Sequence, residues 1–286
     1  MESTTYRFQL GDFECIAISD GNMDYENPAS FMFKNAPQDS LTQALRQHSI
    51  EIDTWKVLIT PYICLVIKTG QNTLLVDTGI GPGFGPGLGL LPRRLSEAGI
   101  PPDSIGTILH THAHGDHIGG DLDADGRSVF PQARFIMSRL EWDFWTSEST
   151  LAQPHYEWLA SFARKILLPL QDHFQLIEQD TAIFPGIRLI EAVGHTPGHL
   201  MVELSSNGSK LLVTSDTFLH PIHIEQPGWY ASVDVQPDLA VRTRRTLLER
   251  ASAEQALVLS FHFPFPGLGY IRKGEAGYRW ESISVE

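Results

Sequence analysis

The segment from Thr111 to Gly120 concentrates side chains that bind metal ions. It contains His112, His114, Asp116 and His117. Imidazole and carboxylate are the usual ligands of catalytic zinc, and Mn, Fe and Co accept the same donors. In an extended segment, His112 and His114 point the same way and can bind one ion, which leaves Asp116 and His117 for a second. We therefore interpret the segment as a metal-binding loop.

Two other interpretations of this segment stay open. It could be a histidine-rich surface loop, although clustered His and Asp are a metal-site signal and the apolar run Ile105–Leu109 leads directly into it. His110 also offers a competing register with His112 and His114. Because His110 ends the apolar run, we expect it to be a strand residue.

Three later residues, His195, Asp216 and His262, each follow an apolar run that we expect to be a strand. Strand ends that converge at one edge of a sheet are where α/β proteins assemble their sites. We expect His195 to complete the ligands of the first ion and His262 those of the second. Asp216 is expected to bridge both ions with its two oxygens.

Other residues are assigned supporting roles. Asp77 ends an apolar strand and needs a partner, so it either orients a metal-ligating histidine or caps a turn. His199 is assigned the same orienting role. The glycine-rich segment Gly79–Leu91 is a mobile lid or a surface loop. Four aromatic residues are expected as walls of an apolar substrate pocket: Phe84, Trp145, Phe218 and Phe265.

The composition is that of an ordinary globular protein, with 42% hydrophobic and 19% charged residues among 286. A net charge of −13 argues against nucleic-acid and anionic membrane partners. We expect a small-molecule substrate and leave a homodimer open. Cys15 and Cys64 have no C-x-x-C partner and are expected to be buried free thiols. Together with an N-terminus that lacks a signal-peptide pattern, they predict a cytoplasmic location.

Groups of strands alternate twice with groups of helices along the chain. The pattern predicts a single α/β domain over residues 1–286, with two sheets packed face to face and helices outside. A hairpin is expected over residues 6–20 and a helix over 40–48 in an otherwise irregular stretch from 21 to 56. A further helix is expected over 154–167.

The combined motif resembles the metallo-β-lactamase superfamily. The matching segments are Thr111–His117, Gly194–His199, Ser215–Asp216 and His262, and the likeness extends from Leu74 onward. The resemblance implies an αββα sandwich, in which two packed mixed sheets carry helices on their outer faces. It also implies a dinuclear metal site at the edge between the sheets.

Within that superfamily, Ser260–Ile271 and Gly277–Trp280 are similar to methyl parathion hydrolase and its relatives. The overall layout also resembles the N-acyl homoserine lactone lactonases. Those lactonases commonly carry a tyrosine three residues after the bridging aspartate, where this chain has Leu219. Only residues 263–286 follow His262, too few for the helical substrate domain of glyoxalase II.

We therefore expect a metal-dependent hydrolase acting on a small neutral lactone, ester or phosphotriester. Two divalent ions, with zinc as the first choice, would share a bridging water, lower its pKa and polarise the attacked centre. Asp216 would bridge the ions, and Asp116 would carry a proton to the leaving group. The alternatives are a mononuclear iron dioxygenase of the same fold, of the persulfide dioxygenase type, and a non-catalytic metal-stabilised binding module.

Overall fold

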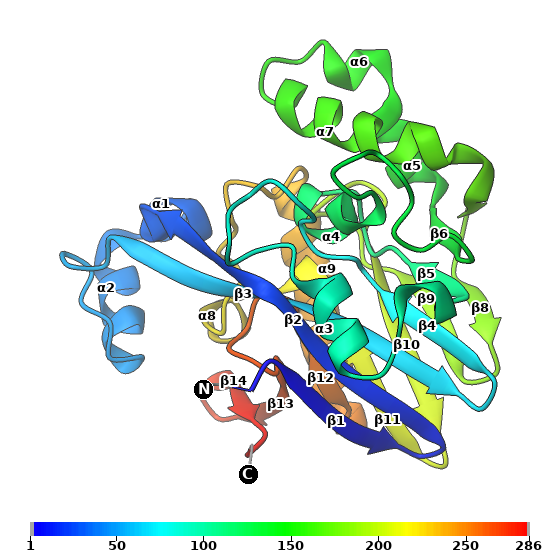
Figure 1. Ribbon diagram of the computed structural model, residues 1–286. Coiled ribbons are helices and arrows are strands. Elements are labelled where there is room, and N and C mark those ends of the chain that lie inside the picture. The colour runs from blue at the N-terminus through cyan, green and yellow to red at the C-terminus, as the bar shows by residue number, and fades with distance from the viewer. Residues whose placement is uncertain (1–2, 285–286) are drawn as a thin grey trace.

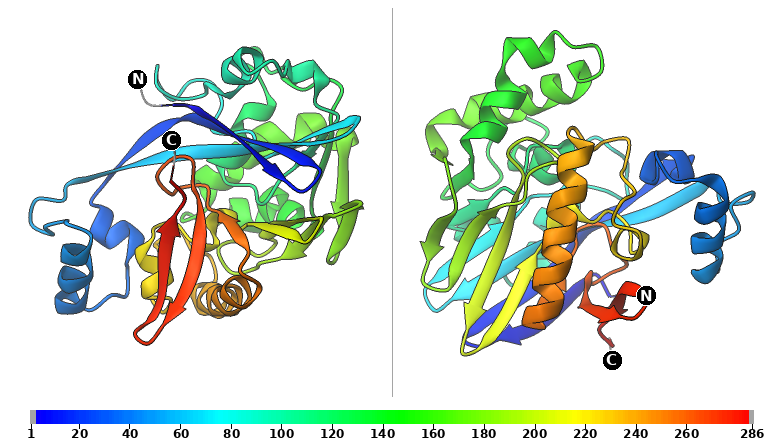
Figure 2. Two further views of the ribbon diagram at one scale, coloured as in Figure 1. Left: turned by 90° about the horizontal axis from the view of Figure 1, so that it is seen from below. Right: turned by 180° about the vertical axis from the view of Figure 1, so that it is seen from behind.

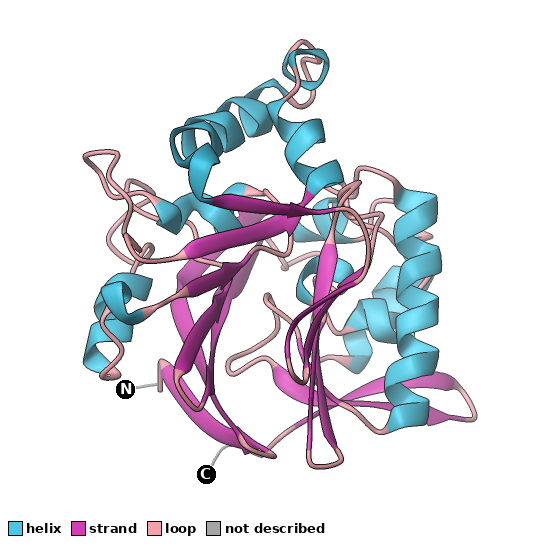
Figure 3. Ribbon diagram, turned by 90° about the vertical axis from the view of Figure 1, so that its right-hand side faces the viewer, coloured by secondary structure: helices cyan, strands magenta, loops and turns pink. Residues whose placement is uncertain are grey.

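The computed structural model describes residues 3–284 and places them in two sheets of seven strands each (Figures 1 and 3). The first sheet follows the chain order: β1 (Thr5–Leu10), β2 (Phe13–Glu26), β3 (Val57–Thr69), β4 (Asn72–Val76), β5 (Thr107–Leu109), β6 (Arg134–Ser138) and β7 (Phe174–Ile177). The second sheet runs in reverse order from β14 to β8: β14 (Gly277–Ser282), β13 (Leu268–Gly274), β12 (Leu257–Leu259), β11 (Ser209–Val213), β10 (Leu200–Ser206), β9 (Ile187–Glu191) and β8 (Thr181–Phe184). Both sheets are mixed, because β4 to β7 are parallel in one and β11 and β12 are parallel in the other.

Helices lie on the outer faces of both sheets. The long helix α9 runs along the outside of the second sheet, and α5, α6 and α7 lie above the first (Figure 2). The helix bounds are α1 (Pro28–Met32), α2 (Gln38–Gln47), α3 (Leu91–Glu97), α4 (Gly115–Ile118), α5 (Arg139–Thr146), α6 (Glu148–Leu151), α7 (Glu157–Leu167), α8 (Ile222–Glu225) and α9 (Pro237–Glu254). Short 3-10 turns are η1 (Pro102–Ser104), η2 (Gly119–Asp121), η3 (Leu168–His173) and η4 (Ser215–Thr217). Within residues 3–284, no helix is long and apolar enough to cross a membrane.

Strands at the centre of each sheet are apolar on both faces because both faces are covered. On β2, Cys15 and Ala17 join the core between the sheets, whereas Ile16 and Ile18 face the helices. Cys15 and Cys64 are both buried and free, as expected. The predicted αββα sandwich is confirmed.

The structure extends the first hairpin well beyond the predicted end at residue 20, because β2 continues to Glu26. Glycine often ends a strand, but here a β-bulge between Ser19 and Gly21 accommodates Gly21, and the pairing of β2 with β3 resumes beyond it. Pro61 is tolerated within β3 because β4 pairs only with Leu65–Thr69, so this part of β3 has no neighbour on that side.

One predicted helix begins a few residues later than expected, and some short elements were not expected at all. The predicted helix over 154–167 begins at Glu157, since Gln153 to Tyr156 form a tight turn first. The stretch from 21 to 56 is less irregular than expected, because α1 precedes α2. The short elements β8 and α8 were not predicted, since four residues carry little periodic signal.

A buried carboxylate joins the two ends of the glycine-rich segment. Asp20 is fully buried and accepts hydrogen bonds from the backbone N–H of Ile80 at 2.9 Å and of Leu91 at 2.7 Å. Burial, against the lowering effect of these hydrogen bonds, raises the pKa of Asp20 from 3.8 to about 6. Asp20 therefore fixes the segment that Phe84 belongs to.

This raised pKa predicts a pH-dependent stability. The folded state binds the Asp20 proton more tightly than the unfolded state. The contribution of this protonation to the free energy of unfolding is therefore complete below pH 4, and it is lost as the pH rises through about 6. Relative to Asp20→Asn, the wild type should lose about 3 kcal/mol of unfolding free energy across that interval. Urea unfolding of both chelated proteins at several pH values measures this, and a constant difference between them would contradict it.

Candidate metal centre

The ends of several strands bring the predicted site residues to one edge between the two sheets. The parallel strands β4 and β5 end side by side, and the His-rich segment and Asp77 follow them. In the second sheet, the parallel strands β11 and β12 end together and are followed by Asp216 and His262. His195 lies in the turn between β9 and β10. Segments far apart in the sequence therefore meet because parallel strands end at the same edge.

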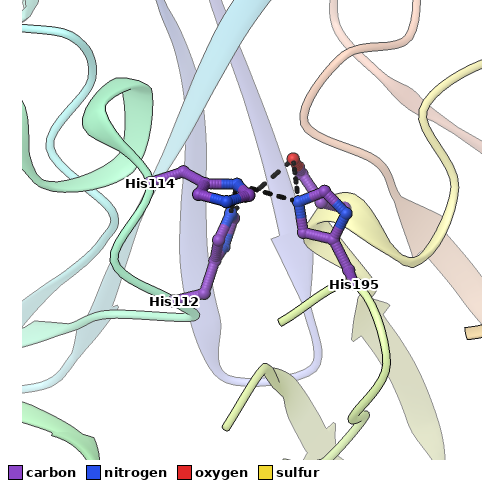
Figure 4. A group of neighbouring side chains, drawn as sticks. His112, His114 and His195 are labelled. Atoms are coloured by element: carbon purple, nitrogen blue, oxygen red, sulfur yellow. Dashed lines mark hydrogen bonds and ion pairs between the residues drawn. The ribbon is translucent and has the colours of Figure 1, made fainter. Parts of the chain in front are cut away.

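The first group of donors consists of His112, His114, His195 and Asp216, all buried. His114 Nδ1 lies 3.1 Å from His112 Nε2 and 3.0 Å from His195 Nε2. The Asp216 Oδ2 atom is 3.3 Å from His195 Nε2. The three imidazoles converge on one point (Figure 4).

The second group consists of Asp116, His117 and His262. Asp116 and His117 lie in the short helix α4, so the extended conformation expected for this segment ends at His114. His262 Nε2 is nevertheless 3.4 Å from Asp116 Oδ2. Asp216 reaches this group too, since its Oδ1 is 3.3 Å from His117 Nε2.

These residues fit two divalent ions. Zinc ligands lie about 2.0–2.1 Å from the ion, so two of them are separated by little more than 3 Å, as the imidazole nitrogens are here. Although they are 3.3 Å apart, His117 Nε2 and Asp216 Oδ1 are buried and make no well-directed hydrogen bond to each other or to any other described residue. Burial lowers the pKa of His112 and His114 well below 6.5, which favours the neutral imidazole that binds metals.

Carboxylates orient two of the histidines from behind. Asp77 Oδ2 lies 2.8 Å from His117 Nδ1, and the carboxylate also accepts hydrogen bonds from Thr111. On the opposite side, Asp234 Oδ1 lies 2.8 Å from His195 Nδ1. Such contacts set the tautomer and direction of a metal-ligating imidazole. Asp77 is where the sequence proposed an orienting carboxylate, whereas Asp234 stands between two valines without a motif.

Two further buried side chains hold the ligand loops. His199 accepts the backbone N–H of Asp216 at 3.3 Å and contacts the Ala192 carbonyl at 3.1 Å, so it faces the backbone of the shared aspartate. Glu141 on α5 accepts the backbone N–H groups of Ala113 and Gly198, both at 2.9 Å. Sequence reasoning missed Glu141, because nothing in its segment distinguishes it from a surface glutamate of a helix.

A cavity of about 240 Å³ opens onto both donor groups. His114, Asp116, His195, Asp216 and His262 contribute to its wall. Much of the remaining wall is apolar and comes from several elements: Met23, Phe31, Met32, Leu159, Leu219 and Val233. The arrangement can hold a small molecule whose polar part faces the donors and whose apolar part lies against these side chains.

Of the four aromatic residues expected in the wall, only Phe84 lines this cavity. Trp145 is fully buried behind His114 and donates a hydrogen bond to Glu141 at 2.7 Å. Phe218 is buried in the core beneath α9, and Phe265 packs against the core between the sheets. The structure therefore does not bring Trp145, Phe218 and Phe265 into the wall of this cavity, because their rings pack in or against the core.

Comparison with known proteins identifies what the chain is similar to. The family model of the metallo-beta-lactamase superfamily matches residues 61–262. An N-acyl homoserine lactonase of Bacillus thuringiensis is 28% identical over 228 residues, which is 72% of this chain and 83% of the relative.

Two solved structures cover nearly the whole chain. One is AidC, described as a dizinc quorum-quenching lactonase in complex with a product, N-hexanoyl-L-homoserine, with a TM-score of 0.90, 27% identity and 99% coverage of both chains. The other is the hydrolase AbOPH in the beta lactamase superfamily, with a TM-score of 0.90, 26% identity, and coverage of 100% of this chain and 99% of that one.

Proposed function

The chain belongs to the metallo-β-lactamase superfamily, and from that membership we propose that it hydrolyses small neutral lactones carrying an apolar acyl chain. It is a metal-dependent hydrolase with a site for two divalent ions, and the dizinc neighbour supports zinc. The lactonases among its relatives favour a lactone over the esters and phosphotriesters that the sequence also left open.

The observation that carries this proposal is the cavity, in which metal-binding donors and an apolar wall face the same space. An acyl chain requires apolar surface, and a lactone carbonyl requires a polarising group at one end of that surface. Among the described residues that line the cavity, none is lysine or arginine, so away from the metal donors no side chain of the wall offers a fixed positive charge to an anionic substrate. The net charge of −13 also disfavours anions.

Two bound ions would supply an acidified attacking water and a polarised carbonyl. We propose that His112, His114 and His195 hold one ion, that Asp116, His117 and His262 hold the other, and that Asp216 contacts both. Asp77 and His199 would keep His117 and the Asp216 backbone in place. Asp116 lies at the cavity wall, so its carboxylate can carry a proton to the leaving oxygen.

A hydrolysis panel on protein of measured metal content tests the substrate class. It contains acyl homoserine lactones of increasing chain length, aryl esters and neutral phosphotriesters. We expect kcat/KM to be highest for lactones and to rise with acyl length until the apolar wall is covered. Chelated protein serves as the control. An aryl ester or phosphotriester preferred over every lactone would contradict the proposed substrate, while leaving the hydrolase assignment intact.

A further inference from the structure

Two tyrosine hydroxyls stand out in the otherwise apolar part of the cavity wall. Tyr25 on β2 and Tyr62 on β3 both line the cavity, and their Oη atoms are 2.8 Å apart. Among the described lining residues, no other side chain carries a hydroxyl. A polar pair in such a wall needs an explanation, because buried polar groups are stabilised only by the hydrogen bonds they make.

Aromatic contacts fix the pair beside the second donor group. The Tyr62 ring packs edge-on against His262, with ring centroids 5.4 Å apart, and against Phe261 at 5.7 Å. The Tyr25 ring stacks on Phe31 at 4.9 Å. Both rings are therefore held by neighbouring aromatic rings, and the Tyr62 ring contacts a residue of the proposed metal site.

Holding β2 and β3 together does not account for this hydrogen bond. The two strands pair from Glu14–Lys68 to Glu26–Val57, so the backbone ladder already spans the region of both tyrosines. One extra hydrogen bond between side chains adds only about 1 kcal/mol to such a ribbon. The backbone hydrogen bonds between β2 and β3 therefore do not explain why both tyrosine hydroxyls lie at the cavity.

The two hydroxyls have one hydrogen-bond donor more than their mutual hydrogen bond uses. A tyrosine hydroxyl, with an ordinary pKa of about 10, keeps its hydrogen at neutral pH, so the pair has two hydrogens. The bond between the two Oη atoms uses one of them. Among the described residues, no third group bonds to either hydroxyl, so the second hydrogen has no protein acceptor. Whichever tyrosine donates to the other, one donor remains for a molecule in the cavity.

We propose that the Tyr25–Tyr62 pair donates this hydrogen bond to the substrate oxygen that gains negative charge when the carbonyl is attacked. This inference rests on the proposed hydrolysis of a carbonyl substrate. The pair acts as a unit: one hydroxyl donates its hydrogen to the substrate, and the other donates to the oxygen of the first and so holds it in position. A donor already aimed at the developing charge stabilises the transition state more than the ground state, so its loss lowers kcat more than it raises KM.

The test compares Tyr25→Phe, Tyr62→Phe and the double variant with the wild type. Phenylalanine retains the rings that contact Phe31 and His262, so only the hydroxyls are lost. We expect each single variant to lower kcat by about 100-fold or more, with KM changed less than about threefold and metal content unchanged. The double variant should be little worse than the poorer single variant, because removing either hydroxyl already disrupts the unit.

Tyr278→Phe, on β14 and away from the cavity, is the matched control and should keep the wild-type kcat. Unchanged kcat in both single variants, or a lower melting temperature as their only change, would overturn the role of the pair. The wild type decides the proposed function separately. If it hydrolyses an aryl ester and no lactone, the lactone proposal fails, and the same kcat comparison is made with the ester.

Discussion

Asp216→Ala is expected to leave fewer than two metal ions bound per chain and to abolish measurable hydrolysis. The Asp216 carboxylate is the group that faces both donor sets, with Oδ1 3.3 Å from His117 Nε2 and Oδ2 3.3 Å from both His195 Nε2 and His262 Nε2. Residues that only orient a ligand are worth about 10- to 100-fold in metal affinity. Removal of a ligand that two ions share should therefore lower the metal affinity by more than about a hundredfold.

Elemental analysis after gel filtration, together with the rate of lactone hydrolysis, measures both effects. Asp143→Ala is the matched control, because Asp143 lies on the exposed side of α5 and should leave metal content and rate unchanged. Two ions per chain and full activity in Asp216→Ala would refute its assignment. His112→Ala should behave like Asp216→Ala, since its Nε2 lies among the donors of the first group.

Glu141→Ala is expected to produce a large loss of stability although Glu141 is not one of the metal donors. Oε1 of Glu141 accepts hydrogen bonds from Ala113 and Trp145, and Oε2 accepts them from Thr196 and Gly198. The side chain thus joins the loop of His112 and His114 to the loop of His195. Alanine would leave these donors buried without an acceptor, at about 1–3 kcal/mol each.

We therefore expect Glu141→Ala to lower the unfolding free energy by at least about 4 kcal/mol and to weaken metal binding, because the two loops lose their common anchor. Glu141→Gln should be intermediate, since one oxygen of the carboxylate is replaced by an NH₂ group that cannot accept. Urea unfolding in chelator separates stability from metal binding, which a zinc titration then measures. Glu249→Ala, exposed on α9, is the control. A loss in Glu141→Ala no larger than in this control would show that Glu141 does not join the loops.

The sequence predicted the layers of the fold and the residues that the structure brings together at the sheet edge, because both leave local signals. Short apolar runs mark the central strands, and His and Asp at the ends of strands mark a site. Gly21 illustrates the limit of such signals: the same residue type that ends many strands forms a bulge here, and the pairing of β2 with β3 decides between the two.

The supporting and lining residues could not be predicted in this way, because packing between distant segments selects them. Asp234 and Glu141 act on histidine-bearing loops that are remote in the sequence, and neither stands in a motif. Trp145 lies on the same helix as Glu141, and Phe218 lies two residues after Asp216, but the rings of both pack in the core. Tyr25 lies in a stretch where no strand was expected, so its position facing the cavity followed only from the extended β2.

The central claim is that hydrolysis by this chain requires two divalent ions, and a metal titration tests it most directly. Chelated protein receives zinc in steps while bound metal and lactone hydrolysis are both measured. We predict two ions bound per chain and full activity only when both sites are filled. A protein that instead holds one iron per chain, consumes oxygen with a thiol substrate and hydrolyses no lactone or ester would contradict the claim.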